Sequence, residues 1–184
     1  GGAVHLSRFH RVVEVDHPLP VREPSPFDPA RDRIASNVAE LVGDGCTIQT
    51  GIGSIPDALL RRLADRKDLG FHTELFSDGM LALVEAGVAT GARKELWPGK
   101  AVTSFVLGSE RLYQEVDSNQ AIEMQPSDVT NDPTRIARMR NFIAINGALS
   151  VDLTGQVNAD SVGTRLYSGI GGQVDFLRGA ARSE

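Results

Sequence analysis

Apolar positions along the chain alternate between helical spacing and short continuous runs. Four segments carry apolar residues at helical spacing: residues 34–42, 59–63, 80–84 and 112–116. Four short apolar runs separate or follow them: residues 46–48, 71–76, 102–107 and 121–124. This alternation of helix and strand is typical of a mainly parallel α/β sheet.

The pattern changes after residue 141. Residues 142–146 and 149–153 are apolar runs, and Thr154-Gly155 is a turn signal before residues 156–158. These features predict a local antiparallel ribbon. The expected fold class is therefore a three-layer α/β fold, mainly parallel with some antiparallel strands. Ligand sites in such sheets lie beyond the carboxyl ends of the strands.

Three polar positions predict how helices begin. Ser54 with Asp57 three residues later forms an aspartate variant of the capping box, and Asp78 follows an apolar run as a possible N-cap. Asp132-Pro133 is typical of a helix start, since proline lacks an N–H that a first turn would leave unpaired.

The first part of the chain is rich in proline. Five prolines lie within residues 18–29, which predicts that this stretch is extended and free of helix. We expect residues 1–31 to form a linker or strap and residues 32–184 to form a globular domain. This irregular start, and an end without a closing strand or capped helix, lead us to expect a piece of a longer protein.

Composition narrows the class of partner. The 184 residues carry a formal charge of −5 with a pI of about 5.4, which argues against nucleic acid or an anionic membrane as the main partner. Cys46 is the single cysteine, so we expect no disulfide framework and a reducing, cytoplasmic compartment. No apolar run reaches the roughly 20 residues of a membrane span, and a signal-peptide pattern is absent.

Glu74 is an ionisable residue inside an apolar strand pattern. Phe71, Leu75 and Phe76 surround it in sequence. A carboxylate that loses hydration there must be paired, neutralised or used in chemistry. An ordinary exposed glutamate with inward-turned neighbours is the alternative, because side chains alternate between faces of a strand.

Three loops accompany Glu74 at expected strand ends. Residues 51–56 join a strand to a helix start, where free N–H groups can receive an anion, but Pro56 rules out a dinucleotide fingerprint. Residues 127–133 carry side-chain oxygens that could simply cap the next helix. Residues 168–176 hold three glycines within four positions, which permits close approach of a ligand to the backbone. Val174 and Phe176 are expected to anchor this loop. A flexible surface loop and a simple tight turn at residues 51–56 are the alternatives.

Other chemistries have weaker support. His72 is the one histidine near these loops, so a metal cluster is not expected. Cys46 lies in a strand pattern as a small core residue, and no Gly-x-Ser-x-Gly elbow is present.

Four motifs in this order resemble the acetyl-CoA hydrolase/transferase family: Gly51-Ile52-Gly53-Ser54-Ile55-Pro56, His72-Thr73-Glu74 with Ser77-Asp78-Gly79, Thr130-Asn131-Asp132-Pro133, and Gly171-Gly172-Gln173-Val174-Asp175-Phe176. The His-Thr-Glu form is most similar to 4-hydroxybutyrate and butyryl CoA-transferases. The resemblance implies a CoA-transferase-like fold and a two-domain enzyme, with this chain as the first part of its second domain.

The resemblance also implies roles for particular residues. Glu74 would be the nucleophile that forms a glutamyl-CoA thioester, with Asn131 and Gly172 as the oxyanion hole. Thr73, Ser77 and the helix start near Asp78 are expected to donate hydrogen bonds to Glu74. The turn at residues 51–56 would line the acyl end of the substrate, and the glycine loop at residues 168–176 would lie under CoA. The expected cofactor-binding residues are therefore Gly51, Gly53, Ser54, Ile55, Gly169, Gly171, Gly172 and Gln173. Arg165 or Arg178 could contact the CoA phosphates.

The expected reaction is CoA transfer between an acyl-CoA and a small carboxylate of the acetate, butyrate or 4-hydroxybutyrate class, without a metal. The expected full-length enzyme is a homo-oligomer, a dimer, and the isolated 184 residues are expected to be inactive. An acyl-CoA hydrolase is the alternative within the same chemistry. Two alternatives from other functional classes are a non-catalytic CoA-binding domain and a sugar-phosphate isomerase. An isomerase would need a general base beside a phosphate-binding loop, and no loop pairs a histidine with a carboxylate in that way.

Overall fold

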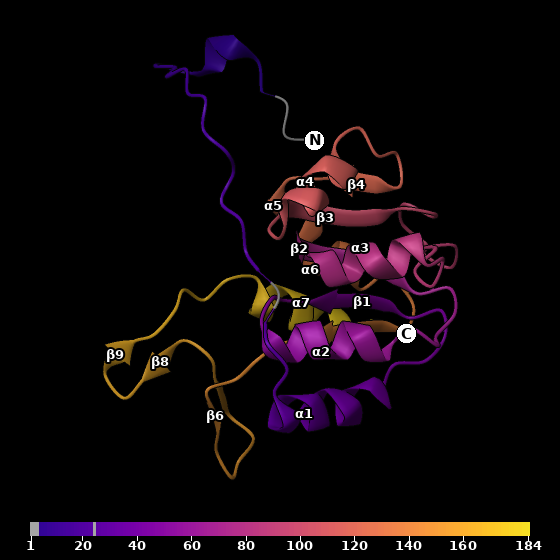
Figure 1. The fold of residues 1–184 in the computed structure, drawn as a ribbon. Coiled ribbons are helices and arrows are strands. Elements are labelled where there is room, and N and C mark those ends of the chain that lie inside the picture. Colours follow the sequence, from indigo (N-terminus) through magenta and orange to yellow (C-terminus); the bar gives the residue numbers. More distant parts are fainter. Residues whose placement is uncertain (1–3, 24) are drawn as a thin grey trace.

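A five-stranded sheet forms the centre of the computed structural model, which describes residues 4–23 and 25–184 (Figure 1). Its order is β4-β3-β2-β1-β5, and every pairing is parallel. The strands are β1 (Thr47–Thr50), β2 (Gly70–Phe76), β3 (Ala101–Val106), β4 (Ile122–Met124) and β5 (Phe142–Ile145). The prediction of a mainly parallel α/β sheet is confirmed.

Helices cover both faces of this sheet. One side packs four helices into the larger hydrophobic core: α1 (Pro29–Ala39), α2 (Ser54–Arg62), α3 (Asp78–Glu85) and α4 (Glu110–Val116). The other side carries three: α5 (Ser127–Thr130), α6 (Pro133–Ile136) and α7 (Gln173–Ala180). Figure 1 shows α2 and α3 in front of the sheet. All four residues of β1 are buried, as expected for a central strand covered on both faces.

The apolar faces mostly match the predicted periodicity. Leu59, Leu60 and Leu63 are buried, and burial of each such side chain contributes about 1.5–3 kcal/mol. Within residues 34–42, Ile34 is 46% exposed, and Leu41 is the larger exception, since 76% of its surface is exposed. It lies beyond the end of α1, whose buried residues are Ala35 and Ala39. The predicted inward position of Leu41 was therefore wrong.

Two predicted helix caps were also wrong. Gly53, not Ser54, is the N-cap of α2 and has no side chain that could cap it, and the Asp57 carboxylate accepts a hydrogen bond from Arg22 at 3.1 Å. Asp78 is the first residue of α3 rather than its N-cap, and its carboxylate accepts a hydrogen bond from the backbone N–H of Ser109 at 2.9 Å. The predicted start at Asp132 is confirmed, since its side chain caps the N–H of Thr134 in α6.

Two short antiparallel hairpins follow β5. The first pairs β6 (Ser150–Val151) with β7 (Val157–Asn158), and the second pairs β8 (Ser161–Val162) with β9 (Arg165–Leu166). They project beyond the sheet in Figure 1. The predicted antiparallel ribbon is confirmed, whereas residues 142–145 join the main sheet parallel to β1.

The strap is extended over most of its described length. Within the predicted strap over residues 1–31, a 3-10 turn, η1 (Leu6–Arg8), precedes the prolines, and α1 begins at Pro29, so the helix-free prediction for the proline-rich stretch was wrong at its last residue. Residues 1–3 and Pro24, which the predicted strap included, lie outside the described residues. The strap is attached where Arg22 pairs with Asp57 at 3.1 Å and Tyr113 donates to the carbonyl of Pro20 at 2.6 Å. Among the described helices, none has the length and apolar character needed to cross a membrane.

Candidate active site

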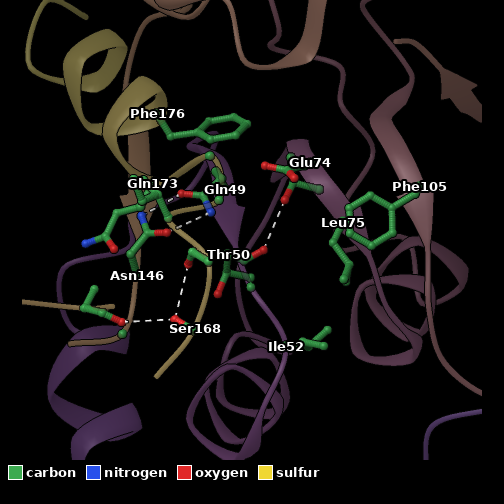
Figure 2. A pocket seen from close by; sticks show the side chains of 18 residues that line it. Gln49, Thr50, Ile52, Glu74, Leu75, Phe105, Asn146, Ser168, Gln173 and Phe176 are labelled. Atoms are coloured by element: carbon green, nitrogen blue, oxygen red, sulfur yellow. Dashed lines mark hydrogen bonds between the residues drawn. The ribbon is translucent and has the colours of Figure 1, made fainter. Parts of the chain in front are cut away.

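A pocket of about 260 Å³ lies at the carboxyl ends of β1, β2 and β5 (Figure 2). Strand β1 has β2 on one side and β5 on the other, so the chain changes direction across the sheet at this place. Such switch points leave a crevice outside the strand ends, where α/β proteins bind ligands. Glu74 lines the pocket together with Thr50, Phe105 and Phe176.

Glu74 receives a hydrogen bond from the side of the sheet that carries α5, α6 and α7. It is half-buried near the end of β2, and its Oε2 accepts a hydrogen bond from Nδ2 of Asn131 at 2.8 Å. Asn131 directly follows α5, which packs against β2 and β3. The carboxylate of Glu74 in this strand is therefore paired, and its partner is Asn131.

The other predicted donors lie elsewhere. Thr73 faces away from Glu74 because strand side chains alternate, and its hydroxyl donates to the carbonyl of Thr50 at 3.1 Å. The Ser77 hydroxyl is buried without a partner among the described residues. The expectation that Thr73 and Ser77 bind Glu74 was therefore wrong.

Gly172 closes the site from the start of α7. A β-carbon at this position would lie 2.2 Å from Oε2 of Glu74 and 2.5 Å from Nδ2 of Asn131, so any side chain here must displace both groups. Its φ of −86° is ordinary, so glycine is favoured here by the close approach of Glu74 and Asn131 and not by the backbone conformation. The carboxylate thus lies at the N-terminal end of α7, where the helix dipole stabilises negative charge. Within residues 4–23 and 25–184, no acceptor receives the backbone N–H of Gly172.

The predicted cofactor-binding residues divide between two adjoining pockets. Gly51, Gly169, Gly171, Gly172 and Gln173 line the pocket of Glu74. Gly53, Ser54 and Ile55 line a neighbouring space of about 470 Å³, bordered also by α1 and by residues 145–148.

Gly51, Ile52, Asn146 and Gly147 border both spaces. The side-chain amides of Gln49 and Asn146 bond each other at 2.9 and 3.3 Å across the wall of the first pocket, as Figure 2 shows.

The glycine loop is anchored by one of its two expected residues. Phe176 is fully buried, and its ring stacks on Phe142 with 6.3 Å between centroids. Val174 is 44% exposed, so its predicted anchoring role was wrong. Arg165 lies in the projecting hairpin and Arg178 on the exposed side of α7, and neither lines either pocket.

Two residues without a role predicted from the sequence, His72 and Lys94, support the site from behind. His72 is fully buried, and its Nε2 must carry the proton because it bonds the carbonyl oxygen of Thr130 at 2.8 Å. Burial, with the nearby charge of Lys94, lowers the pKa of His72 to about 4. The imidazole is therefore neutral at pH 7.

Lys94 is also buried behind the site. Its ammonium donates to the carbonyls of Phe71 and Lys100 at 2.8 and 2.7 Å, while burial lowers its pKa to about 7. No spacing or composition in the sequence marks Lys94 as a buried cation. His72 has one signal, since it shares a strand face with Glu74 two residues later. No group of three or more His, Cys, Asp or Glu in the described ranges could hold a metal.

Comparisons with known proteins agree with this arrangement. Residues 108–184 match the model of the acetyl-CoA hydrolase/transferase C-terminal domain. A succinyl-CoA:acetate/propanoyl-CoA:succinate CoA transferase of Fasciola hepatica is 46% identical over 182 residues, with 98% of this chain and 38% of that protein covered. A 4-hydroxybutyrate coenzyme A transferase of Clostridium kluyveri is 43% identical over 181 residues, with 98% of this chain and 42% of that protein covered.

The crystal structure of a 4-hydroxybutyrate CoA-transferase from Porphyromonas gingivalis superimposes with a TM-score of 0.85 at 42% identity, covering 98% of this chain and 43% of that one. Proteins named acetyl-CoA hydrolase appear at lower identity, for example 30% over 194 residues. The chain thus spans less than half the length of the relatives it matches. On its fold, its motifs and these matches, the chain belongs to the acetyl-CoA hydrolase/transferase family.

Proposed function

We propose that this chain carries the nucleophile of a CoA-transferase, which moves CoA between an acyl-CoA and a small carboxylate. The convergence of Glu74, Asn131 and Gly172 at one point of the pocket carries the proposal. The acyl and acceptor groups belong to the acetate, succinate, butyrate or 4-hydroxybutyrate class, as in the names of the relatives.

The reaction begins with attack of the Glu74 carboxylate on the thioester carbonyl. The carbon–sulfur bond breaks, CoA leaves as a thiolate, and a mixed anhydride remains on Glu74. The thiolate then attacks the γ-carbonyl of Glu74, which expels the first carboxylate and leaves a glutamyl-CoA thioester. A second carboxylate reverses these steps and departs as the new acyl-CoA, so Glu74 is regenerated.

Asn131 and Gly172 would stabilise the oxyanions that form in these steps. The Asn131 amide has two N–H groups, and the bond to Glu74 uses one of them. The Gly172 backbone N–H has no acceptor within the described part of the chain and lies where Glu74 and Asn131 meet. Loss of one oxyanion donor typically costs about 100–1000-fold in rate.

The two pockets suggest where the substrates lie. In this proposal CoA crosses Gly169, Gly171 and Gln173, and the turn that contains Gly53, Ser54 and Ile55 borders the acyl side. The second space is lined by Ile34 and Val38 of α1, which suits an apolar acyl chain.

The direct test is to trap the intermediate on Glu74. The natural polypeptide that contains this chain is incubated with acyl-CoA, treated with borohydride and analysed by peptide mass spectrometry. A glutamyl-CoA thioester would be reduced to the alcohol at Glu74, whereas Glu74→Gln would show neither reduction nor transfer. Reduction at another residue, or near-normal transfer by Glu74→Gln, would sink the assignment. Glu85→Gln, at the end of α3 and outside the lining of both pockets, is a matched control.

Hydrolysis is the second candidate, because acetyl-CoA hydrolases occur among the relatives. The two reactions differ in whether water or a carboxylate receives the acyl group or CoA. Assays of acyl-CoA loss and of free CoA, with and without added acetate, separate them. A hydrolase releases free CoA without acetate, whereas a transferase consumes acyl-CoA only when a carboxylate is present and forms a new acyl-CoA instead of free CoA. A homodimer in a reducing, cytoplasmic compartment completes the proposal, and gel filtration with light scattering measures the oligomeric state.

A further inference from the structure

We infer that Thr130 is a positioning residue that determines which end of the Asn131 amide faces Glu74. This inference rests on the proposed function of Glu74. Thr130 is fully buried and lines neither pocket, so it does not touch a substrate there. It acts through Asn131, the next residue in the chain.

The hydrogen bonds around Thr130 have one consistent direction. An ionised Glu74 can only accept, so the end of the Asn131 amide that faces it must be Nδ2. Oδ1 of Asn131 then faces Thr130, whose hydroxyl donates to it at 2.8 Å. The Thr130 hydroxyl also lies 3.5 Å from the carbonyl oxygen of Ser127, a longer contact than the one to Asn131. Since a hydroxyl has one proton and Thr130 donates it to Asn131, Thr130 accepts from the hydroxyl of Ser104. The order of donors is therefore Ser104, Thr130, Asn131, Glu74.

The backbone of Thr130 is held as firmly as its side chain. Its carbonyl oxygen accepts from Nε2 of His72, which lies on the same face of β2 as Glu74. Strand β2 thus holds α5 at two points: His72 binds the Thr130 backbone, and Glu74 binds the Asn131 side chain. The neutral, buried imidazole is a fixed donor at pH 7.

Rotation of the Asn131 amide by half a turn would reverse its polarity. Oδ1 would then face Oε2 of Glu74, and two acceptors would oppose each other. The Thr130 hydroxyl stabilises the productive orientation because it supplies a proton where Oδ1 lies. This matters most after Glu74 has become an anhydride or thioester, since its acyl oxygen then attracts Nδ2 less strongly than a carboxylate does.

The test compares three substitutions in the natural polypeptide. Thr130→Val keeps the volume and removes the hydroxyl, Thr130→Ala removes it without adding a methyl group, and Thr130→Ser keeps it. We expect kcat of the Val and Ala variants to fall roughly tenfold, which is the scale of one lost hydrogen bond, with KM for acyl-CoA within about twofold. Thr130→Ser should transfer at close to the wild-type rate. Thr134→Val, an exposed residue of α6, is the matched control.

Two outcomes would overturn the inference. One is an equal loss in Thr130→Ser and Thr130→Val, because packing rather than the hydroxyl would then matter. The other is unchanged kcat in both Thr130→Val and Thr130→Ala. Should Thr130→Val fail to fold, the Ala and Ser variants carry the same comparison.

A second measurement does not depend on transfer. Hydrogen exchange of the Asn131 side-chain amide, followed by NMR, should accelerate in Thr130→Val and Thr130→Ala but not in Thr130→Ser. If wild-type protein showed no glutamyl thioester but this exchange pattern held, the proposed function would fail while Thr130 would still orient Asn131. Equal protection in wild type, Thr130→Val and Thr130→Ala would reject the orienting role even in an active transferase.

Discussion

Nδ2 of Asn131 lies 2.8 Å from Oε2 of Glu74, although 57 residues separate them in the chain. The contact joins the end of β2 to the residue after α5, and Gly172 lies against both atoms. Three segments of the chain therefore meet at one carboxylate.

Asn131→Ala should lower kcat about 100-fold or more while the affinity for CoA stays near wild type, because the amide contacts the reacting carboxylate. Asn131→Asp should be at least as slow, since it places a second negative charge beside Glu74. Steady-state kinetics with acyl-CoA as the varied substrate check both. A change confined to KM would count against the oxyanion role.

Gly172→Ala should lower kcat at least tenfold, because the new β-carbon would overlap Oε2 of Glu74 and Nδ2 of Asn131 and must displace them. Its φ of −86° suits alanine, so the fold should be retained. Gly43→Ala is the control, as the nearest atom to its added β-carbon is the Cys46 sulfur at 3.9 Å. Activity equal to wild type in Gly172→Ala would contradict this prediction, because Glu74 and Asn131 would then tolerate displacement.

Arg22→Ala should release the strap, because it leaves the mostly buried Asp57 without its cation. Removal of one member of such a pair should cost about 1–3 kcal/mol in the free energy of unfolding. Limited proteolysis should then cut within residues 9–28 sooner than in wild type. Arg31→Ala breaks the exposed pair with Asp28 and should change stability by less than about 0.5 kcal/mol. Identical proteolysis of the two variants would contradict the anchoring role.

His72 should make stability depend on pH. Its folded pKa is about 4 and its unfolded value about 6.5, so the unfolded chain binds more protons between these values. Stability should therefore fall as the pH falls from about 6.5 to 4, by up to about 3 kcal/mol. Lys94, whose pKa is about 7 in the folded state, is protonated in both states over most of this range and adds little slope.

Denaturant unfolding at several pH values checks the His72 prediction. His72→Phe should be less stable at pH 7, because the Thr130 carbonyl loses its donor, and should show a smaller slope between pH 4 and 6.5. Substitution of the exposed His10 by Gln should leave the slope unchanged. An equal slope in wild type and His72→Phe would show that other groups cause the pH dependence.

The predicted elements agree with the structure where periodicity is strong. The strand at Gly70–Phe76 and the buried face of Leu59, Leu60 and Leu63 follow from apolar spacing, because burial of these side chains drives both local structure and packing. Capping was harder to predict. Asp57 and Asp78 are residue types suited to helix starts. Their carboxylates instead accept hydrogen bonds from Arg22 and Ser109, which approach from distant parts of the chain.

The sequence by itself determined the alternation of helices and strands, the loops at strand ends and the isolated carboxylate of Glu74, because these depend on residues near one another in the chain. Only the tertiary structure decided which donor reaches Glu74. It selected Asn131 over Thr73 and Ser77, placed Gly172 against both, and put Thr130 and His72 behind them. The physical reason is that strand alternation and the packing of α5 and α7 on one face of the sheet select contacts without regard to sequence distance.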